Sequence, residues 1–183
     1  AHLVVNSLTK YIGGHGNALG GAITDLGSFD WERFDNVLEL YRVGDPALWG
    51  INQLKKKGLR DFGASMASDA AHRLSVGADT LALRMARCCE SAERIAQFLA
   101  GHSAVDRVYF PGLPDHPQHD QSKKWFKSHG AILSFELRAD LDCFDLLDAM
   151  NLVVKATHLG DLRTLALPVA HTIFYEVGPE RRG

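Results

Sequence analysis

The sequence predicts an α/β fold, because short apolar strands alternate with amphipathic helices along its 183 residues. Residues 133–137 show the clearest strand pattern, in which Leu, Phe and Leu alternate with polar side chains. Residues 79–101 show the clearest helix pattern, because apolar side chains recur there every three or four positions. A third observation is a glycine-rich loop at residues 13–21, which separates two strands expected at residues 3–5 and 21–24.

The predicted elements fall into three consecutive segments. Residues 1–66 form a strand, a loop and a second strand, and end in an irregular region that contains several aromatic residues. Residues 67–103 hold two helices; the first is expected to end near Gly77, and Asp79 is expected to cap the second. Residues 104–183 form a second αβ segment. Its strands are expected at residues 105–109, 133–137, 152–154 and 165–167, and a helix at residues 142–150.

Composition and charge argue against two classes of partner. The chain carries 20 basic and 22 acidic side chains, and its one basic run, residues 55–57 with Arg60, is typical of a solvated surface. Nucleic acid or an anionic membrane would require a concentrated basic face, so neither is expected as a partner. The sequence shows no apolar stretch near the roughly 18 residues of a membrane span and no opening secretory signal. We therefore expect a cytoplasmic protein.

Neither the cysteines nor the clustered histidines predict a metal site. Cys88 and Cys89 would project in different directions from a helix, and together with Cys143 they make an odd number, so reduced core thiols are expected. Residues 115–120 are rich in His and Asp, but this loop contains prolines and lacks the i, i+4 spacing of helical metal ligands.

The most specific stretch of the sequence surrounds Lys10. Ser7 and Thr9 place two hydroxyl groups before this lysine, directly after an apolar strand and directly before the glycine-rich loop. Hydroxyl and backbone N–H groups at such a turn bind phosphate, and a lysine at the end of a buried strand can lose water until its amine becomes nucleophilic. These residues could hold a phosphate-bearing carbonyl compound, with Lys10 forming an imine. The alternative is that Lys10 is a surface charge beside a flexible loop.

Residues 7–17, followed by Gly20 and Gly21, resemble the attachment signature for pyridoxal 5′-phosphate (PLP) of the Cys/Met-metabolism, or transsulfuration, enzymes. Further similarity appears at residues 57–63, 80–85 and 159–165, so that matching segments span nearly the whole chain in family order. The resemblance is greatest to the homoserine-ester branch, which contains the O-acetyl- or O-succinylhomoserine sulfhydrylases and the cystathionine γ-synthases.

The resemblance implies a fold, a cofactor and residue roles. The fold would be that of the PLP-dependent transferases of fold type I, with part of the large domain in residues 1–66, linking helices in residues 67–103 and most of the small C-terminal domain in residues 104–183. PLP would be the cofactor. Lys10 would bind it and later move protons, and Ser7 and Thr9 would bind its phosphate. The reaction would be γ-replacement on an activated homoserine by sulfide or cysteine.

A departure from the family pattern lies in the turn that binds the substrate carboxylate. Family lyases have Glu-Ser before the Leu-Gly pair, whereas Thr157 and His158 precede Leu159 and Gly160 here. This difference disfavours a dedicated cystathionine lyase. It also makes His158 a candidate substrate contact, with a purely structural histidine as the alternative.

The ends of the chain suggest a piece of a longer protein. The chain starts at Ala1 without an initiator Met, and an apolar strand pattern follows at once. In relatives, the aspartate that pairs with the pyridine nitrogen and the tyrosine that stacks on the ring precede the lysine strand, and a substrate-binding arginine follows the point where this chain stops. We therefore expect the 183-residue piece alone to be inactive and a parent about twice as long to carry the activity.

Two other functions stay open. Within the family, the alternative reaction is γ- or β-elimination from cystathionine or a related amino acid. In a different class, the piece could be a non-catalytic assembly module, because relatives form homotetramers. Four aromatic residues are candidates for such a contact surface: Trp31, Phe34, Tyr41 and Trp49.

Overall fold

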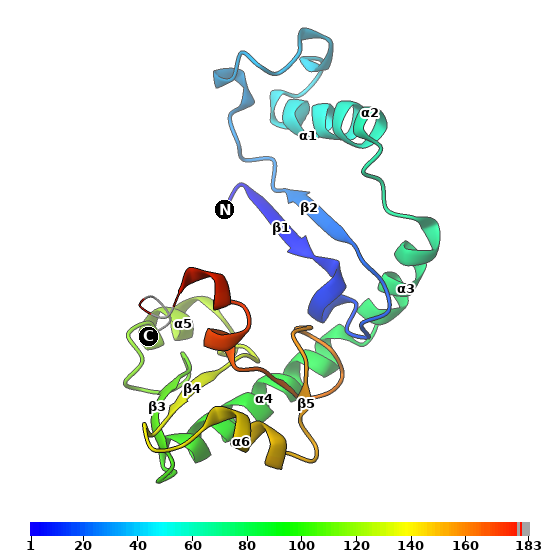
Figure 1. The fold of residues 1–183 in the computed structure, drawn as a ribbon. Coiled ribbons are helices and arrows are strands. Elements are labelled where there is room, and N and C mark those ends of the chain that lie inside the picture. Colours follow the sequence, from blue (N-terminus) through cyan, green and yellow to red (C-terminus); the bar gives the residue numbers. More distant parts are fainter. Residues whose placement is uncertain (179, 181–183) are drawn as a thin grey trace. The chain divides into compact units, whose positions relative to one another are not determined.

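The computed structural model describes residues 1–178 and 180 (Figure 1). These residues form two compact units; the first is Ala1–Ala78 and the second begins at Asp79. Both units mix helices and strands, so the predicted α/β class is confirmed. The boundary falls between the two helices expected in residues 67–103, which are α3 (Ser68–Ala78) and α4 (Leu81–Ala100). The division into segments 1–66, 67–103 and 104–183 stays a prediction.

The first unit begins with an antiparallel hairpin. Strand β1 (Leu3–Ser7) pairs with β2 (Gly21–Asp25), from Leu3 opposite Asp25 to Ser7 opposite Gly21. Both strands were expected from the sequence. The burial expected for β1 is wrong within this unit, because Val5 is 74% exposed and only Leu3 is partly covered. The hairpin therefore determines where the chain turns after Ser7, but it leaves this end of the strand exposed.

Helix α3 packs directly on the loop between the two strands. The side chain of Leu74 is buried against this loop, and its methyl carbons lie within 2.6 Å of where a Cβ on Gly13 or Gly20 would stand. A Cβ on Gly77 would lie 2.1 Å from the Gly13 carbonyl oxygen. Such approaches are possible only where no side chain intervenes, so the glycines at these positions permit the contact between helix and loop.

The expected irregular region after β2 contains more helix than the sequence predicts. Short 3₁₀ turns occur at η2 (Trp31–Arg33), η3 (Glu39–Tyr41) and η4 (Pro46–Leu48). A continuous helical stretch follows. It consists of α1 (Trp49–Gln53), the wider π-type segment η5 (Leu54–Leu59) and α2 (Arg60–Phe62). Its lysines at residues 55–57 are exposed, as expected for a solvated basic surface.

Aromatic residues pack against the start of this helical stretch, and one of them is more buried than expected. Phe29, Trp31 and Phe34 contact one another, with Phe29 and Trp31 ring centroids 4.6 Å apart. The Trp31 ring occupies the space where a Cβ on Gly50 would stand, at 2.3 Å, so the helix needs a glycine at this contact. Tyr41 is only 5% exposed, and its proposed place on a contact surface is therefore wrong.

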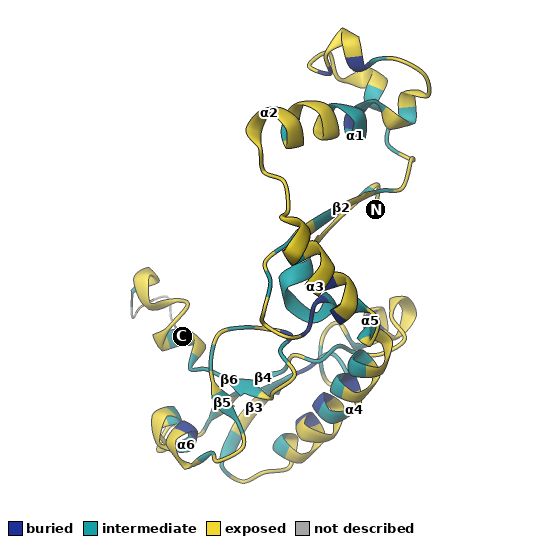
Figure 2. Ribbon diagram, turned by 90° about the vertical axis from the view of Figure 1, so that its right-hand side faces the viewer, coloured by how far each residue is buried: buried dark blue, intermediate teal, exposed yellow. Residues whose placement is uncertain are grey.

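The second unit is built on α4. This helix packs on β3 (Val105–Tyr109), which pairs with β4 (Ser134–Leu137) in antiparallel orientation, and buried residues follow one side of the helix (Figure 2). Ala92 and Ala96 of α4 meet Phe110 and Leu113, which are all almost fully buried, and Val108 and Leu133 border them. Small side chains on the helix let the strand pair approach closely, with the Phe110 ring filling the core.

The remaining elements of the second unit are short. They are α5 (His119–Trp125), α6 (Cys143–Ala149) and a parallel strand pair, β5 (Val154–Lys155) with β6 (Leu165–Ala166). Asp142 caps α6 by accepting the Phe144 N–H at 2.7 Å. The expected cap of α4 is wrong, because Thr80 rather than Asp79 occupies the cap position and its side chain makes no capping bond. The three cysteines are free thiols, as expected, but only Cys89 is buried; Cys88 and Cys143 are half-buried, so their expected place in the core is wrong.

No helix in residues 1–178 is both long enough and apolar enough to cross a membrane.

We predict that Gly77→Ala destabilises the first unit by about 1–3 kcal/mol, because the new methyl group overlaps the Gly13 carbonyl. Gly58→Ala is the matched control: it also lies in a helical segment, and nothing lies within 4 Å of its added Cβ. Alanine has the higher helix propensity, so this control should be neutral or stabilising by up to about 1 kcal/mol. Urea unfolding followed by tryptophan fluorescence measures both, since Trp31 and Trp49 report on this unit. Equal effects of the two substitutions would contradict the contact.

Candidate functional site

Lys10 lies in a wide turn that begins where β1 ends. The turn η1 (Leu8–Ile12) is closed by the Gly13 N–H, which donates to the Leu8 carbonyl at 2.8 Å, and by the Gly14 N–H, which donates to the Lys10 carbonyl at 2.8 Å. Lys10 itself departs from helical geometry, with φ −87° and ψ −129°. The backbone therefore bends at Lys10 and is held by hydrogen bonds on both sides of the bend.

The Lys10 side chain is half-buried, and its amine is not committed to another group. Within the part of the chain that the structure describes, no hydrogen bond or ion pair uses the Lys10 Nζ. No group of the described residues therefore has to release the Lys10 amine before it contacts a bound molecule.

The two hydroxyl groups near Lys10 have different surroundings. Ser7 is exposed, and its hydroxyl makes no capping bond to the turn that follows. The Thr9 hydroxyl donates to the Gly20 carbonyl at 3.2 Å and accepts the Gly20 N–H at 3.0 Å. The Gly20 carbonyl also accepts the Leu8 N–H at 2.9 Å and the Thr9 N–H at 3.3 Å. Thr9 therefore fastens the far end of the glycine-rich loop to the Lys10 turn.

His15 lies in the same loop and has a structural contact. Its Nδ1 is 2.7 Å from the Gly13 carbonyl oxygen, which gives the ring a local partner in the loop. The ring is exposed, and this bond supports the loop rather than the Lys10 amine.

His158 belongs to the second unit, in the loop between β5 and β6. Its Nε2 is buried and has no hydrogen-bond partner among residues 1–178 and 180. Gly160, with φ +81°, forms the tight turn that follows, and the turn ends at Asp161. An unpartnered buried nitrogen is a group for which a ligand could supply the missing partner.

Asp161 supports this turn, and the sequence did not point to it. Its Oδ1 accepts from the Arg163 backbone N–H at 3.0 Å and from Nε at 3.1 Å, and its Oδ2 accepts from Nη2 at 3.1 Å. The Arg163 side chain and backbone N–H hold the pKa of Asp161 at about 2, and an electrostatic interaction with His158 adds to this lowering. These bonds depend on how the two side chains are oriented, which residue spacing alone does not reveal.

The structure thus brings Ser7, Thr9 and Lys10 together in one turn of the first unit. His158 lies in the other unit. Sequence reasoning missed Leu74 as a contact of the glycine-rich loop; its place on the apolar side of α3 was the only available signal.

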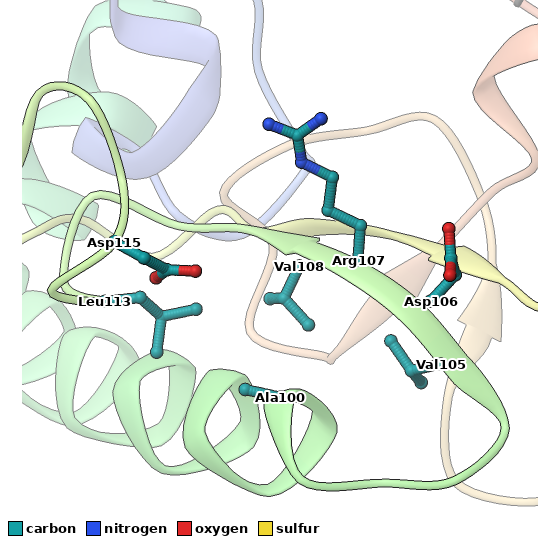
Figure 3. Close-up of a pocket in the computed structure, with 7 residues that line it drawn as sticks. All are labelled: Ala100, Val105, Asp106, Arg107, Val108, Leu113 and Asp115. Carbon is teal, nitrogen blue, oxygen red and sulfur yellow. The ribbon is translucent and has the colours of Figure 1, made fainter.

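A small cavity of about 120 Å³ lies elsewhere, between α4, β3 and the loop after β3 (Figure 3). Val105, Val108 and Leu113 lie between the strand and the helix, whereas Arg107 points away from α4. None of the predicted site residues lines this cavity. In the described part of the chain, no group of three or more His, Cys, Asp or Glu residues could hold a metal ion.

Comparisons with known proteins match the whole chain to one family. The family model for Cys/Met metabolism PLP-dependent enzymes covers residues 1–183. An O-acetyl-L-homoserine sulfhydrylase of Thermus thermophilus is 34% identical over an alignment that covers 100% of this chain and 46% of that protein. An L-methionine gamma-lyase of Porphyromonas gingivalis is also 34% identical and is covered over 41% of its length, with 100% of this chain aligned.

A solved structure agrees with these matches. A Campylobacter jejuni protein, assigned as an O-acetylhomoserine (thiol)-lyase and containing N′-pyridoxyl-lysine-5′-monophosphate, has a TM-score of 0.85 and 28% identity. The match covers 98% of this chain and 46% of that one. This chain therefore spans less than half the length of the relatives that it matches, and it shares their fold.

We predict that Asp161 titrates at about pH 2 in the folded protein and moves toward its ordinary pKa in Arg163→Gln. Because the folded pKa is lowered, the ion pair contributes stability above the unfolded pKa of about 4, and this contribution is lost as the pH falls toward 2. Carboxyl-carbon NMR measures the titration directly. In Asp161→Asn, the urea midpoint of unfolding should fall less between about pH 4 and pH 2 than it does in the wild type. An unchanged titration in Arg163→Gln would contradict the cause.

Proposed function

Because the chain belongs to the family of Cys/Met metabolism PLP-dependent enzymes, we propose that the whole protein replaces the γ-substituent of an activated homoserine with a thiol. The substrate would be O-acetyl- or O-succinylhomoserine, and the incoming thiol would be sulfide or cysteine. The observation that carries this proposal is the Lys10 turn, where an uncommitted amine follows two hydroxyl groups within four residues. A relative of the sulfhydrylase class supports the choice of reaction.

The residues of the turn fit the phosphate of PLP. A phosphate group accepts hydrogen bonds, so each hydroxyl must donate its proton to it. The Ser7 hydroxyl makes no capping bond that it would have to break. The Thr9 hydroxyl can turn its proton away from the Gly20 carbonyl, because the Leu8 and Thr9 N–H groups still satisfy that carbonyl. Thr9 would keep accepting the Gly20 N–H meanwhile.

Lys10 would have two tasks. When bound, PLP supplies an electron sink for the negative charge that develops on the substrate Cα. The Lys10 amine would bind the cofactor covalently before the substrate arrives. Once released, its Nζ would take the proton from Cα and return a proton further along the substrate. The bend at Lys10 sets the backbone from which the amine reaches, so the position of Nζ follows from the turn.

We further propose that His158 contacts the substrate. Its buried Nε2 has no partner in the described part of the chain, and a substrate oxygen would supply one. Asp161 and Arg163 hold the following turn and leave this nitrogen free.

The proposal extends to assembly and location. We propose a cytoplasmic homotetramer, and several apolar side chains of the segment between β2 and α1 support an interface there: Phe34 is 42% exposed and Leu40 is 66% exposed. We further propose that residues 1–183 alone do not turn over substrate, because relatives use more than twice this length. A non-catalytic assembly module would retain such an interface, but PLP would not become attached to its Lys10.

Elimination is the second candidate reaction. It is favoured by the similarity to an L-methionine gamma-lyase, which is as high as the similarity to the sulfhydrylase. The Lys10 turn serves both reactions equally, because both begin with removal of the Cα proton.

We predict that borohydride reduction in the presence of PLP leaves a pyridoxyl group on Lys10 of the whole protein. Peptide mapping by mass spectrometry locates the group. Lys10→Ala removes the only amine in the turn and should abolish this modification. A pyridoxyl group on another lysine of the wild type, with Lys10 unmodified, would overturn the assignment.

Ser7→Ala is the matched control, because it keeps the amine and removes one hydroxyl. It should still form the adduct but bind PLP roughly 10- to 100-fold more weakly, as expected for a lost hydrogen bond to a charged group. Its affinity for pyridoxal, which lacks the phosphate, should not change. An equal loss for both compounds would argue against a phosphate contact.

We predict that the whole protein converts O-acetyl- or O-succinylhomoserine to a thioether or thiol amino acid only when sulfide or cysteine is added. Amino-acid analysis and a 2-oxo acid assay of the same reaction measure both outcomes. Release of 2-oxobutanoate or pyruvate without a thiol would indicate elimination instead. Lys10→Ala should abolish either reaction and serves as the control for background chemistry.

A further inference from the structure

Leu74 of α3 contacts both ends of the glycine-rich loop that follows Lys10. Its Cδ2 lies 2.6 Å from where a Cβ on Gly13 would stand, and its Cδ1 lies 2.5 Å from the equivalent position on Gly20. We propose that Leu74 is a positioning residue for Lys10, acting through these two ends of the loop. The inference rests on the proposed role of Lys10 as the cofactor lysine.

The Gly20 end of the loop is connected to the residues directly before Lys10. The Gly20 carbonyl accepts the Leu8 N–H at 2.9 Å, and the Gly20 N–H donates to the Thr9 hydroxyl at 3.0 Å. A displacement of Gly20 would therefore stretch bonds to both residues. Leu74 and the Met66 sulfur, 2.8 Å from the same Cβ position, limit that displacement.

The Gly13 end is connected to the turn from the other side. The Gly13 N–H donates to the Leu8 carbonyl, and the adjacent Gly14 N–H donates to the Lys10 carbonyl, both at 2.8 Å. The Gly13 carbonyl in turn rests on Gly77, one helical turn beyond Leu74. Lys10 is thus held between two segments that both lie against α3.

The Lys10 amine has no contact of its own that would place it. No hydrogen bond or ion pair within the described residues fixes Nζ, so its position depends on the backbone bend and the packing behind it. Leu74 is 4% exposed and touches both loop ends, which makes it the side chain that links them. A shift of about 1 Å at a reacting group can reduce its effectiveness roughly 100-fold.

The test compares three substitutions in the whole protein. Leu74→Val shortens the side chain at the contact, and it removes less buried volume than an alanine would. Leu74→Met retains the volume and should restore the contact. Leu147→Val is the matched control, because Leu147 is also buried but lies in α6 of the second unit. Three properties are measured: the amide hydrogen exchange of Gly13 and Gly14, the PLP affinity, and the pH profile of the bound cofactor's absorbance.

We expect Leu74→Val to speed the exchange of both amides, to weaken PLP binding roughly 10-fold or more and to shift the absorbance profile. Leu74→Met and Leu147→Val should leave all three near wild type. Equal effects of Leu74→Val and Leu147→Val, or no effect of Leu74→Val, would overturn the inference. If the wild type forms no adduct on Lys10, the proposed function fails, whereas the exchange rates still decide whether Leu74 holds this turn.

Discussion

The close approach of α3 to the loop after Lys10 is the constraint on which the proposed site depends. The helix backbone at Gly77 faces the Gly13 carbonyl so closely that not even a methyl group fits between them. One helical turn earlier, Leu74 fills the space at both ends of the loop. A helix and a loop that meet through glycines form a contact with little freedom to adjust. The geometry at Lys10 therefore comes from packing behind the turn, while the amine in front of it remains uncommitted.

The hydrogen bonds at Gly20 show how such a rigid turn could still respond to a bound phosphate. Three donors converge on the Gly20 carbonyl, although a carbonyl oxygen has two lone pairs. The hydroxyl of Thr9 is the donor that can turn away, because the two backbone N–H groups still pair the part-buried carbonyl oxygen. Cofactor binding would then change the direction of one proton and leave the backbone in place. Ser7, with no capping bond to lose, needs no such exchange.

Local patterns in the sequence predicted most of the elements but few of their contacts. The alternation in residues 133–137 and the three-to-four spacing in residues 79–101 are properties of single segments, and both elements formed as expected. The sequence did not predict the helical stretch at residues 49–62, because a glycine at position 50 weakens the helix signal. That glycine is needed for a contact with the Trp31 ring, which comes from another part of the chain. Similarly, the motif around Lys10 was visible, whereas the roles of Leu74 and Asp161 required knowledge of which groups they touch.

In the proposed function, the Lys10 turn does not decide between replacement and elimination, and the reason is chemical. Both reactions need the same amine, the same phosphate contacts and the same proton transfer at Cα, so the turn suits either. What differs is the fate of the γ-substituent, which depends on how the substrate is held. The departure from the lyase pattern of the family lies at Thr157 and His158, directly before a turn that is followed by the Asp161–Arg163 ion pair. If His158 holds the substrate as proposed, the determinants of reaction type would lie beside that turn rather than at Lys10.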